Sequence, residues 1–105
     1  MMLKSGVNPL GMKTETLLAA IVANEVYALH GHSLVITSIT DGKHGVGSYH
    51  GLGWAIDTRT RHLTDLETET IADEISERLG QFYDVVIEID HIHIEFDAKR
   101  ASCPS

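Results

Sequence analysis

Two short segments contain most of the side chains that could do chemistry. The first covers residues 48–57, and the second, some thirty residues later, covers residues 90–95. Together they offer two histidines and a carboxylate that could hold a metal ion, with a second carboxylate beside them. This set matches a catalytic zinc centre, which has three protein ligands and one open position for water. What the chain does depends on whether the two segments meet in space.

The second segment lies where the buried face of the chain changes parity. Apolar residues occupy odd positions before the segment and even positions from Ile92 onward: Val85, Ile87 and Ile89, then Ile92, Ile94 and Phe96. Because side chains alternate between the faces of a strand, this change predicts a turn or bulge at Asp90–His91. Beyond it, His91, His93 and Glu95 share the face opposite the core.

The first segment is less regular. His50 and Asp57 are seven residues apart, so in one straight strand they would point to opposite faces. Gly51 and Gly53 lie between them and allow the backbone to fold. His50 can then approach from a loop and Asp57 from a strand.

The remaining pattern predicts helices and strands that could position these residues. A helix begins at Thr14 and stops at Gly31, and a strand over residues 34–40 leads into a glycine-rich loop over residues 41–53. The helical spacing places these side chains on the buried face: Leu17, Leu18, Ile21, Val22, Val26 and Leu29.

The second half predicts a short strand, a helix and two further strands. The strand covers residues 54–58, and Thr64 to Glu67 has the form of a capping box that starts a helix ending at Gly80. The buried stripe of this helix holds Ile71, Ile75 and Leu79. Strands follow over residues 83–89 and 91–96. We expect an α+β domain with a small, mainly antiparallel sheet flanked by two helices.

Length, net charge and residue counts exclude several kinds of protein. The 105 residues form one domain, 1–105, with an irregular arm over residues 1–12 and a flexible tail over residues 98–105. The net charge of −7 argues against a nucleic-acid groove. No apolar run is long enough for membrane insertion. Cys103 is the only cysteine, so neither a disulfide framework nor a thiolate metal site is expected. Seven histidines favour a metal.

The two segments together resemble a known family. Ser48-x-His50-x-x-Gly53-x-Ala55-x-Asp57 matches the SxHxxGxAxD motif of zinc D-alanyl-D-alanine carboxypeptidases and dipeptidases. This group includes the L-alanyl-D-glutamate endopeptidases of bacteriophage endolysins, and hedgehog domains share its fold. The group's closing motif, an acid three residues before a histidine, is matched by residues 90–93. The resemblance covers residues 34–97 and implies a hedgehog/DD-peptidase-like fold.

The resemblance also implies roles for individual residues. His50, Asp57 and His93 would bind Zn2+, Asp90 would be the general base and acid, and His91 would stabilise the oxyanion or orient the substrate. For work near neutral pH, we expect Asp90 to be partly desolvated or its charge to be coupled to the metal. The alternative for Asp90 is a turn residue, and Glu88 is the reserve candidate for the base.

Four further residues are candidates for substrate binding. His44 either lines the site or is a solvated loop histidine, and Ser48 braces the loop by hydrogen bonding. Trp54 either forms a wall of the substrate groove or packs in the core. Many peptidases of the group carry an upstream arginine that is missing here, so Lys43, His44 or His91 would have to replace it.

The resulting hypothesis is a compact, monomeric zinc metallopeptidase that hydrolyses an amide bond in the peptide stem of bacterial peptidoglycan, as an endopeptidase or a D,D-carboxypeptidase. Because no signal peptide is recognised, we expect synthesis in a host cytoplasm and action at the cell wall, or a virion-associated role. Two alternatives stay open. One is a catalytically weak, zinc-bound binding module. The other is a structural zinc domain with His91 or His44 as fourth ligand.

Overall fold

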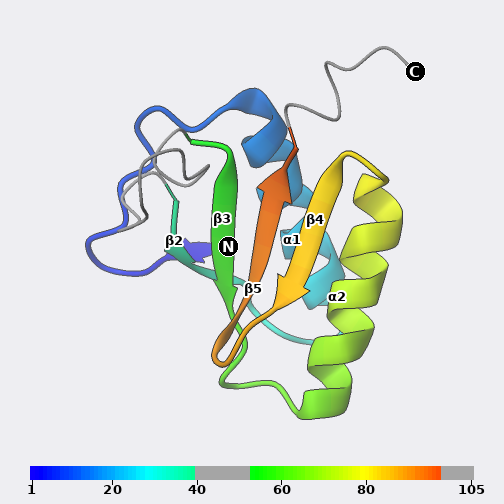
Figure 1. Cartoon of the computed structure of the whole chain (residues 1–105). Helices are drawn as coiled ribbons and strands as arrows, with labels where there is room; N and C mark the ends of the chain where they lie inside the picture. Colours follow the sequence, from blue (N-terminus) through cyan, green and yellow to red (C-terminus); the bar gives the residue numbers. More distant parts are fainter. Residues whose placement is uncertain (40–52, 98–105) are drawn as a thin grey trace.

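The strands form one mixed sheet in the order β1-β2-β3-β5-β4 in the computed structural model, which describes residues 1–39 and 53–97 (Figure 1). All neighbouring strands are antiparallel except β1 and β2. The strands are β1 (Met2–Leu3), β2 (Val35–Ser38), β3 (Ala55–Arg59), β4 (Tyr83–Ile87) and β5 (His91–Phe96), and the helices are α1 (Thr14–Leu29) and α2 (Asp65–Leu79). The predicted α+β class with a mainly antiparallel sheet is confirmed.

The N-terminal arm is not wholly irregular, so that prediction is wrong at its start. Met2–Leu3 adds a parallel strand to the edge of β2, with the Met2 amide donating to Leu34 O and the Lys4 amide to Ile36 O. Nothing in the apolar pattern marks two residues as a strand, because their pairing partner lies more than thirty positions away. The tail over residues 98–105 lies outside the described residues.

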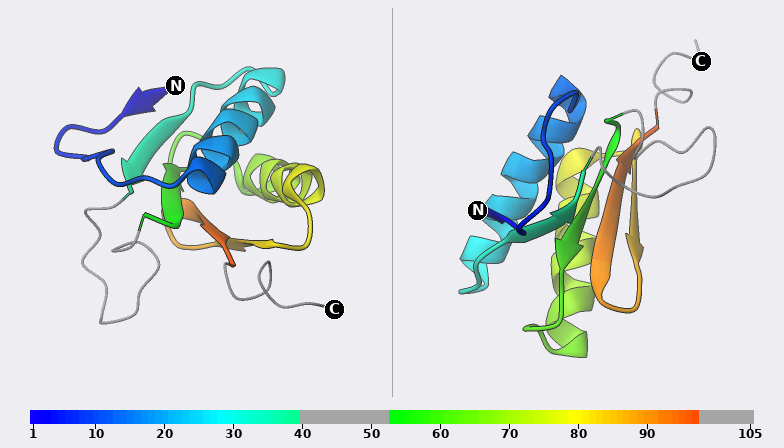
Figure 2. Two further views of the ribbon diagram at one scale, coloured as in Figure 1. Left: turned by 90° about the horizontal axis from the view of Figure 1, so that it is seen from above. Right: turned by 90° about the vertical axis from the view of Figure 1, so that its left-hand side faces the viewer.

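Both helices pack on the same face of the sheet, which leaves a two-layer domain (Figure 2). The core between the layers contains the inward residues of the central strands, including Ile36, Ile56, Ile92 and Ile94, each at most 1% exposed. In the described part of the chain, neither helix is long and apolar enough to cross a membrane. Polar side chains of β3 and β5 occupy the other face of the sheet.

The buried face of α1 differs from the predicted one. Leu17, Leu18, Ile21 and Leu29 are about half exposed or more, and Val22 is only partly buried. Of the predicted residues only Val26 is fully buried, and the other residues that face the core are Thr16, Ala19, Ala20, Ala23 and Tyr27. This set also has helical spacing, so periodicity alone could not separate the two faces. Small alanine side chains allow the helix to approach the sheet and α2 closely.

The parity change between the last two strands is a hairpin turn, as predicted. Ile87 pairs with Ile92 and Val85 with Ile94, so residues of opposite parity share the inner face. The Glu88 amide closes the turn by donating to His91 O at 2.8 Å. β4 ends at Ile87, and Ile89 is fully exposed in the turn. The prediction of a strand extending to Ile89 is therefore wrong.

Helix α2 begins with the predicted capping box. Thr64 Oγ1 accepts from the Glu67 amide at 3.1 Å, and Glu67 Oε1 accepts from the Thr64 amide at 2.9 Å. The other carboxylate oxygen of Glu67 lies 2.6 Å from His32 Nε2, in the segment that follows α1. The Thr64 amide and then His32 lower the pKa of Glu67 to about 2. One carboxylate thus caps α2 and links it to the end of α1.

We predict that Glu67→Gln destabilises the protein in a pH-dependent way. The folded-state pKa of Glu67 lies below its ordinary value of 4.5, so its stabilising contribution is present above that value and is lost as the pH falls towards about 2. Urea unfolding should therefore show a lower midpoint for the variant than for the wild type near neutral pH. This gap between the two midpoints should narrow under acid conditions. Glu69→Gln, an exposed position on the same helix, is the control and should show no such gap. An equally large gap for Glu67→Gln in acid would contradict the prediction.

Candidate metal centre

The register between β3 and β5 places Asp57 directly opposite His93. On either side of this pair, Ala55 faces Glu95 and Arg59 faces His91. Since side chains alternate along a strand, all six belong to the sheet face away from the helices. Ile92 and Ile94, between the polar residues of β5, are buried in the core, so the predicted outward face of this strand is confirmed.

His93 is held between two carboxylates. Its Nδ1 lies 3.0 Å from Asp57 Oδ1, and its Nε2 lies 2.9 Å from Glu95 Oε1. The hydrogen bond to Asp57, and then that to Glu95, raises the pKa of His93 to about 9 against the opposing effect of burial. Without a metal, the imidazole is therefore protonated at neutral pH and donates from both nitrogens. The sequence pattern predicted that Glu95 lies on this face, but no function was predicted for it.

His91 connects Asp90 with Asp57. Its Nδ1 lies 2.7 Å from Asp90 Oδ1, and its Nε2 lies 3.6 Å from Asp57 Oδ2. The hydrogen bond with His91 lowers the pKa of Asp90. The Asp90 side chain is 75% exposed, so the expected partial desolvation of this carboxylate is not found. Its backbone is fixed at the end of β3, because Asp90 O accepts from the Thr60 amide at 3.1 Å.

Helix α1 holds β3 from the opposite face of the sheet. Thr16 Oγ1 donates to Gly53 O at 2.7 Å, just before β3. At the other end of the strand, the Tyr27 hydroxyl donates to Arg59 O at 2.9 Å and lies 3.0 Å from Thr58 Oγ1. Burial raises the pKa of Tyr27 to about 12, so the hydroxyl keeps its proton over the physiological range. These bonds fix the backbone on both sides of Asp57.

The pair formed by Asp57 and His93 fits two positions of a zinc site. Two ligand atoms on a tetrahedral zinc ion lie about 3.3 Å apart, given bond lengths of roughly 2.0–2.2 Å. The observed separation of 3.0 Å between His93 Nδ1 and Asp57 Oδ1 needs only a small outward shift to meet this. Glu95 would then accept from His93 Nε2, the outer contact that commonly orients a metal-binding histidine.

Four of the other predicted site residues lie outside the described residues: His50, the third predicted ligand, together with Lys43, His44 and Ser48. Within residues 1–39 and 53–97, no group of three His, Cys, Asp or Glu side chains is arranged to hold a metal ion. The described residues thus supply two of the three donors that the motif implies.

Trp54 packs at the edge of the core. Its ring stacks on Phe96 with centroids 5.4 Å apart, and Lys13 Nζ lies 5.6 Å from the ring centroid. Phe96 packs against the core and has the parity of Ile92 and Ile94. These contacts favour the packing interpretation of Trp54 over a wall of the substrate groove.

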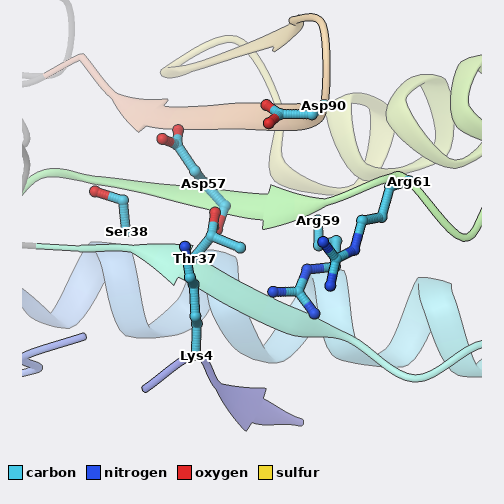
Figure 3. A pocket seen from close by; sticks show the side chains of 7 residues that line it. All are labelled: Lys4, Thr37, Ser38, Asp57, Arg59, Arg61 and Asp90. Atoms are coloured by element: carbon cyan, nitrogen blue, oxygen red, sulfur yellow. The ribbon is translucent and has the colours of Figure 1, made fainter. Parts of the chain in front are cut away.

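A hollow of about 240 Å³ adjoins Asp57 on the outer face of the sheet (Figure 3). Three basic side chains, those of Lys4, Arg59 and Arg61, line it, and sequence reasoning assigned none of them to the site. Arg59 lies one residue beyond the predicted strand over residues 54–58, and the observed strand includes it and so places it on the face of Asp57. Lys4 could not have been found from the sequence, because only the pairing of β1 with β2 brings it there.

Comparisons of the chain with protein-family models, with curated proteins and with solved structures give no match.

We predict that Gly53→Ala destabilises the protein more than Gly31→Ala. Both glycines have φ of +79°, a conformation that costs an alanine about 1–2 kcal/mol. A Cβ on Gly53 would also collide with the carbonyl group of Gly11, whereas a Cβ on Gly31 would meet no atom within 4 Å. Urea unfolding of both variants isolates the effect of this close approach next to β3. Equal losses of stability would show that the contact with Gly11 is unimportant.

Proposed function

We propose that the chain is a zinc-dependent peptidase with a hedgehog/DD-peptidase-like fold that hydrolyses an amide bond in the peptide stem of bacterial peptidoglycan. One observation carries the proposal. The pairing of β3 with β5 brings Asp57 and His93, the described members of the motif's ligand set, to 3.0 Å from one another. The two residues are 36 positions apart in the chain.

Asp57 and His93 would hold the zinc ion together with His50, which the motif supplies from outside the described residues. A bound zinc ion would lower the pKa of a water molecule from about 15.7 towards 7 and polarise the substrate carbonyl. Glu95 would keep the His93 ring in orientation through its contact with Nε2.

Asp90 and His91 would carry out the proton transfer. Asp90 would accept a proton from the attacking water and pass it to the leaving amine. Its hydrogen bond with His91 lowers its pKa, so the carboxylate is ionised at neutral pH but is a weaker base than a free aspartate. As an ionised carboxylate only accepts hydrogen bonds, His91 donates to it through Nδ1. This bond turns His91 Nε2 towards Asp57, where the ring can orient the substrate or stabilise the oxyanion.

The cellular setting belongs to the same proposal. The motif set resembles that of compact bacteriophage enzymes, which are made in the host cytoplasm. Such a protein would act on the peptidoglycan stem peptide at the cell wall, or as part of the virion. The net charge of −7 gives no attraction to an anionic cell wall, which favours a virion-associated role over free diffusion.

The alternatives keep the metal but differ in chemistry. A zinc-bound binding module would cleave no amide bond. A structural zinc domain would use four protein ligands, and His91 Nε2, 3.6 Å from Asp57 Oδ2, is the described candidate for the fourth. Because His91 already bonds Asp90 through Nδ1, we favour a role for it in catalysis.

We predict that Asp90→Ala keeps zinc and the fold but lowers peptidoglycan cleavage by roughly 10²–10⁴-fold, the usual contribution of a general base. His93→Ala should release zinc and lower the melting temperature, because metal binding stabilises the folded state. Zinc content, thermal melting and mass spectrometry of released muropeptides would be measured for each variant. Glu69→Gln, exposed on α2, is the control and should cleave normally, while Glu88→Gln tests the reserve candidate for the base and should cleave normally as well. Zinc loss in Asp90→Ala would contradict its assigned role, and zinc-loaded protein that cleaves nothing would support the binding module.

We also predict that zinc binding releases a proton from His93. With a pKa of about 9, this ring carries a proton near pH 7 that the metal must displace, so the affinity for zinc should rise with pH up to about 9. Calorimetry in two buffers of different ionisation enthalpy measures the proton release.

Glu95→Gln should weaken zinc binding by about 10–100-fold, as is typical for loss of an outer carboxylate partner. Unchanged affinity in this variant would show that Glu95 does not orient His93.

A further inference from the structure

Helix α1 is apolar on both of its faces, although it lies at the surface of a two-layer domain. Of its sixteen residues only Glu15 and Glu25 carry a charge, whereas α2 has seven charged residues in fifteen. A helix of a globular protein normally buries one apolar stripe and turns polar side chains to solvent, and a helix that is apolar all round is normally buried on every side. The sequence of α1 therefore fits a helix whose outer face is also covered.

The outer face of α1 carries a continuous apolar stripe. Residues three, four, seven or eight positions apart lie on one side of a helix. The exposed apolar residues of α1 have this spacing, and the large ones are 45–64% exposed. They are Leu17, Leu18, Ile21, Ala28 and Leu29. An apolar patch of this kind, rimmed by polar side chains, commonly marks a contact with another molecule.

Negative charge borders the stripe on the side of α2. Arg78 joins the two helices, with Nη1 3.0 Å from Glu25 Oε1 and Nη2 3.0 Å from Glu74 Oε2. Asp73 and Glu77 are exposed on α2, and each is directly adjacent in the chain to a member of this bridge. Among the described residues, no cation forms an ion pair with either of them. Because the helices lie side by side in one layer (Figure 2), the layer has an apolar half on α1 and an acidic half on α2.

Charge decides which kind of partner fits this surface. A second copy of the chain would bring another net charge of −7, and an anionic lipid surface would be repelled by the acids of α2. The segments outside the described residues contain only Val46, Tyr49 and Leu52 as large apolar side chains, which are too few to cover the stripe. A molecule with apolar and basic groups side by side would satisfy both halves of the layer.

We propose that the outer face of α1 and the adjoining acids of α2 bind a basic amphipathic helix of another protein. The apolar stripe of that helix would cover Leu18 and Ile21, and its Lys or Arg side chains would reach Asp73 and Glu77. Amphipathic helices bind apolar surfaces through side chains three and four positions apart, and charges at the border fix their orientation.

This contact would leave the proposed metal centre accessible. Both helices cover the inner face of the sheet, whereas Asp57 and His93 lie on the outer face (Figure 2). A partner bound to the helices and a peptide bound at the metal centre would therefore occupy opposite sides of the domain. The proposal does not depend on the peptidase function.

The test compares the binding of three synthetic peptides of equal length to the full chain. The first is a helix of leucine and lysine with an apolar stripe, the second has glutamate in place of lysine, and the third has the composition of the first in an order without a stripe. Fluorescence anisotropy measures the affinities, and NMR shifts of backbone amides locate the contact. We expect the first peptide to bind at least about tenfold more tightly than the others, and more weakly in added salt. It should shift signals of α1 and α2 but not those of β5.

Substitutions on α1 test the apolar half of the surface. Leu18→Gln and Ile21→Gln should each weaken binding of the leucine–lysine peptide by about three- to tenfold, because less apolar area is buried. Ile89→Gln is the matched control, since Ile89 is fully exposed in the hairpin turn, and it should bind as the wild type does. Thermal melting shows whether each variant is folded, and the peptide comparison on the wild-type chain needs no variant.

Substitutions on α2 test the acidic half. Asp73→Asn and Glu77→Gln should each reduce the preference for the lysine peptide over the glutamate peptide. Glu88→Gln, which removes one charge from the hairpin turn, is the matched control and should keep the preference.

Three outcomes would overturn the proposal. The first is equal affinity for the three peptides, or shifts confined to other elements. The second is a dimer of the wild-type chain in sedimentation that Ile21→Gln abolishes, which would assign the stripe to a second copy. The third is tighter binding to vesicles of phosphatidylglycerol than to the leucine–lysine peptide, which would assign it to a lipid surface. Zinc content and muropeptide release, measured separately, decide the peptidase proposal.

Discussion

The antiparallel register between β3 and β5 is the constraint on which the site depends. It sets Asp57 against His93 and leaves His91 and Glu95 as their neighbours on one face. A shift of one residue would turn Asp57 towards the helices and bury a carboxylate among isoleucines. The apolar residues Ile56, Ile92 and Ile94 therefore determine which face the polar ones occupy, because a shift by one residue cannot leave all three in the core.

Charge balance on the outer face explains how these polar groups coexist. His93 lies between two carboxylates and is protonated in the metal-free protein, which offsets part of their repulsion. A divalent ion in the same place would take over this role. In the metal-free protein, the protonated ring of His93 therefore supplies a positive charge at the site that we propose for zinc. Zinc binding at this site would displace the proton of His93, so the affinity for the metal would depend on pH.

The two faces of the sheet serve different purposes. On the inner face, Thr16 and Tyr27 of α1 bond to the backbone at each end of β3 and fix it firmly. On the outer face, basic and acidic side chains adjoin one another, with the carboxylates nearer β5 and the cations nearer β1 and β2 (Figure 3). The outer face therefore presents groups of both signs to a molecule that lies across the strands.

Local pattern was enough to determine the order of most elements, the capping box of α2 and the hairpin at Asp90, because each depends on residues close together in the chain. The parity of Ile92 and Ile94 also determined that His91, His93 and Glu95 face outward. Other features were decided only by the tertiary structure, because they depend on pairing between distant segments. These are the strand at Met2–Leu3, the alanine-lined face of α1, the contact of His93 with Asp57, and the position of Lys4 in the same hollow as Arg59. Periodicity states which residues share a face, but only packing decides which face is buried and what lies across from it.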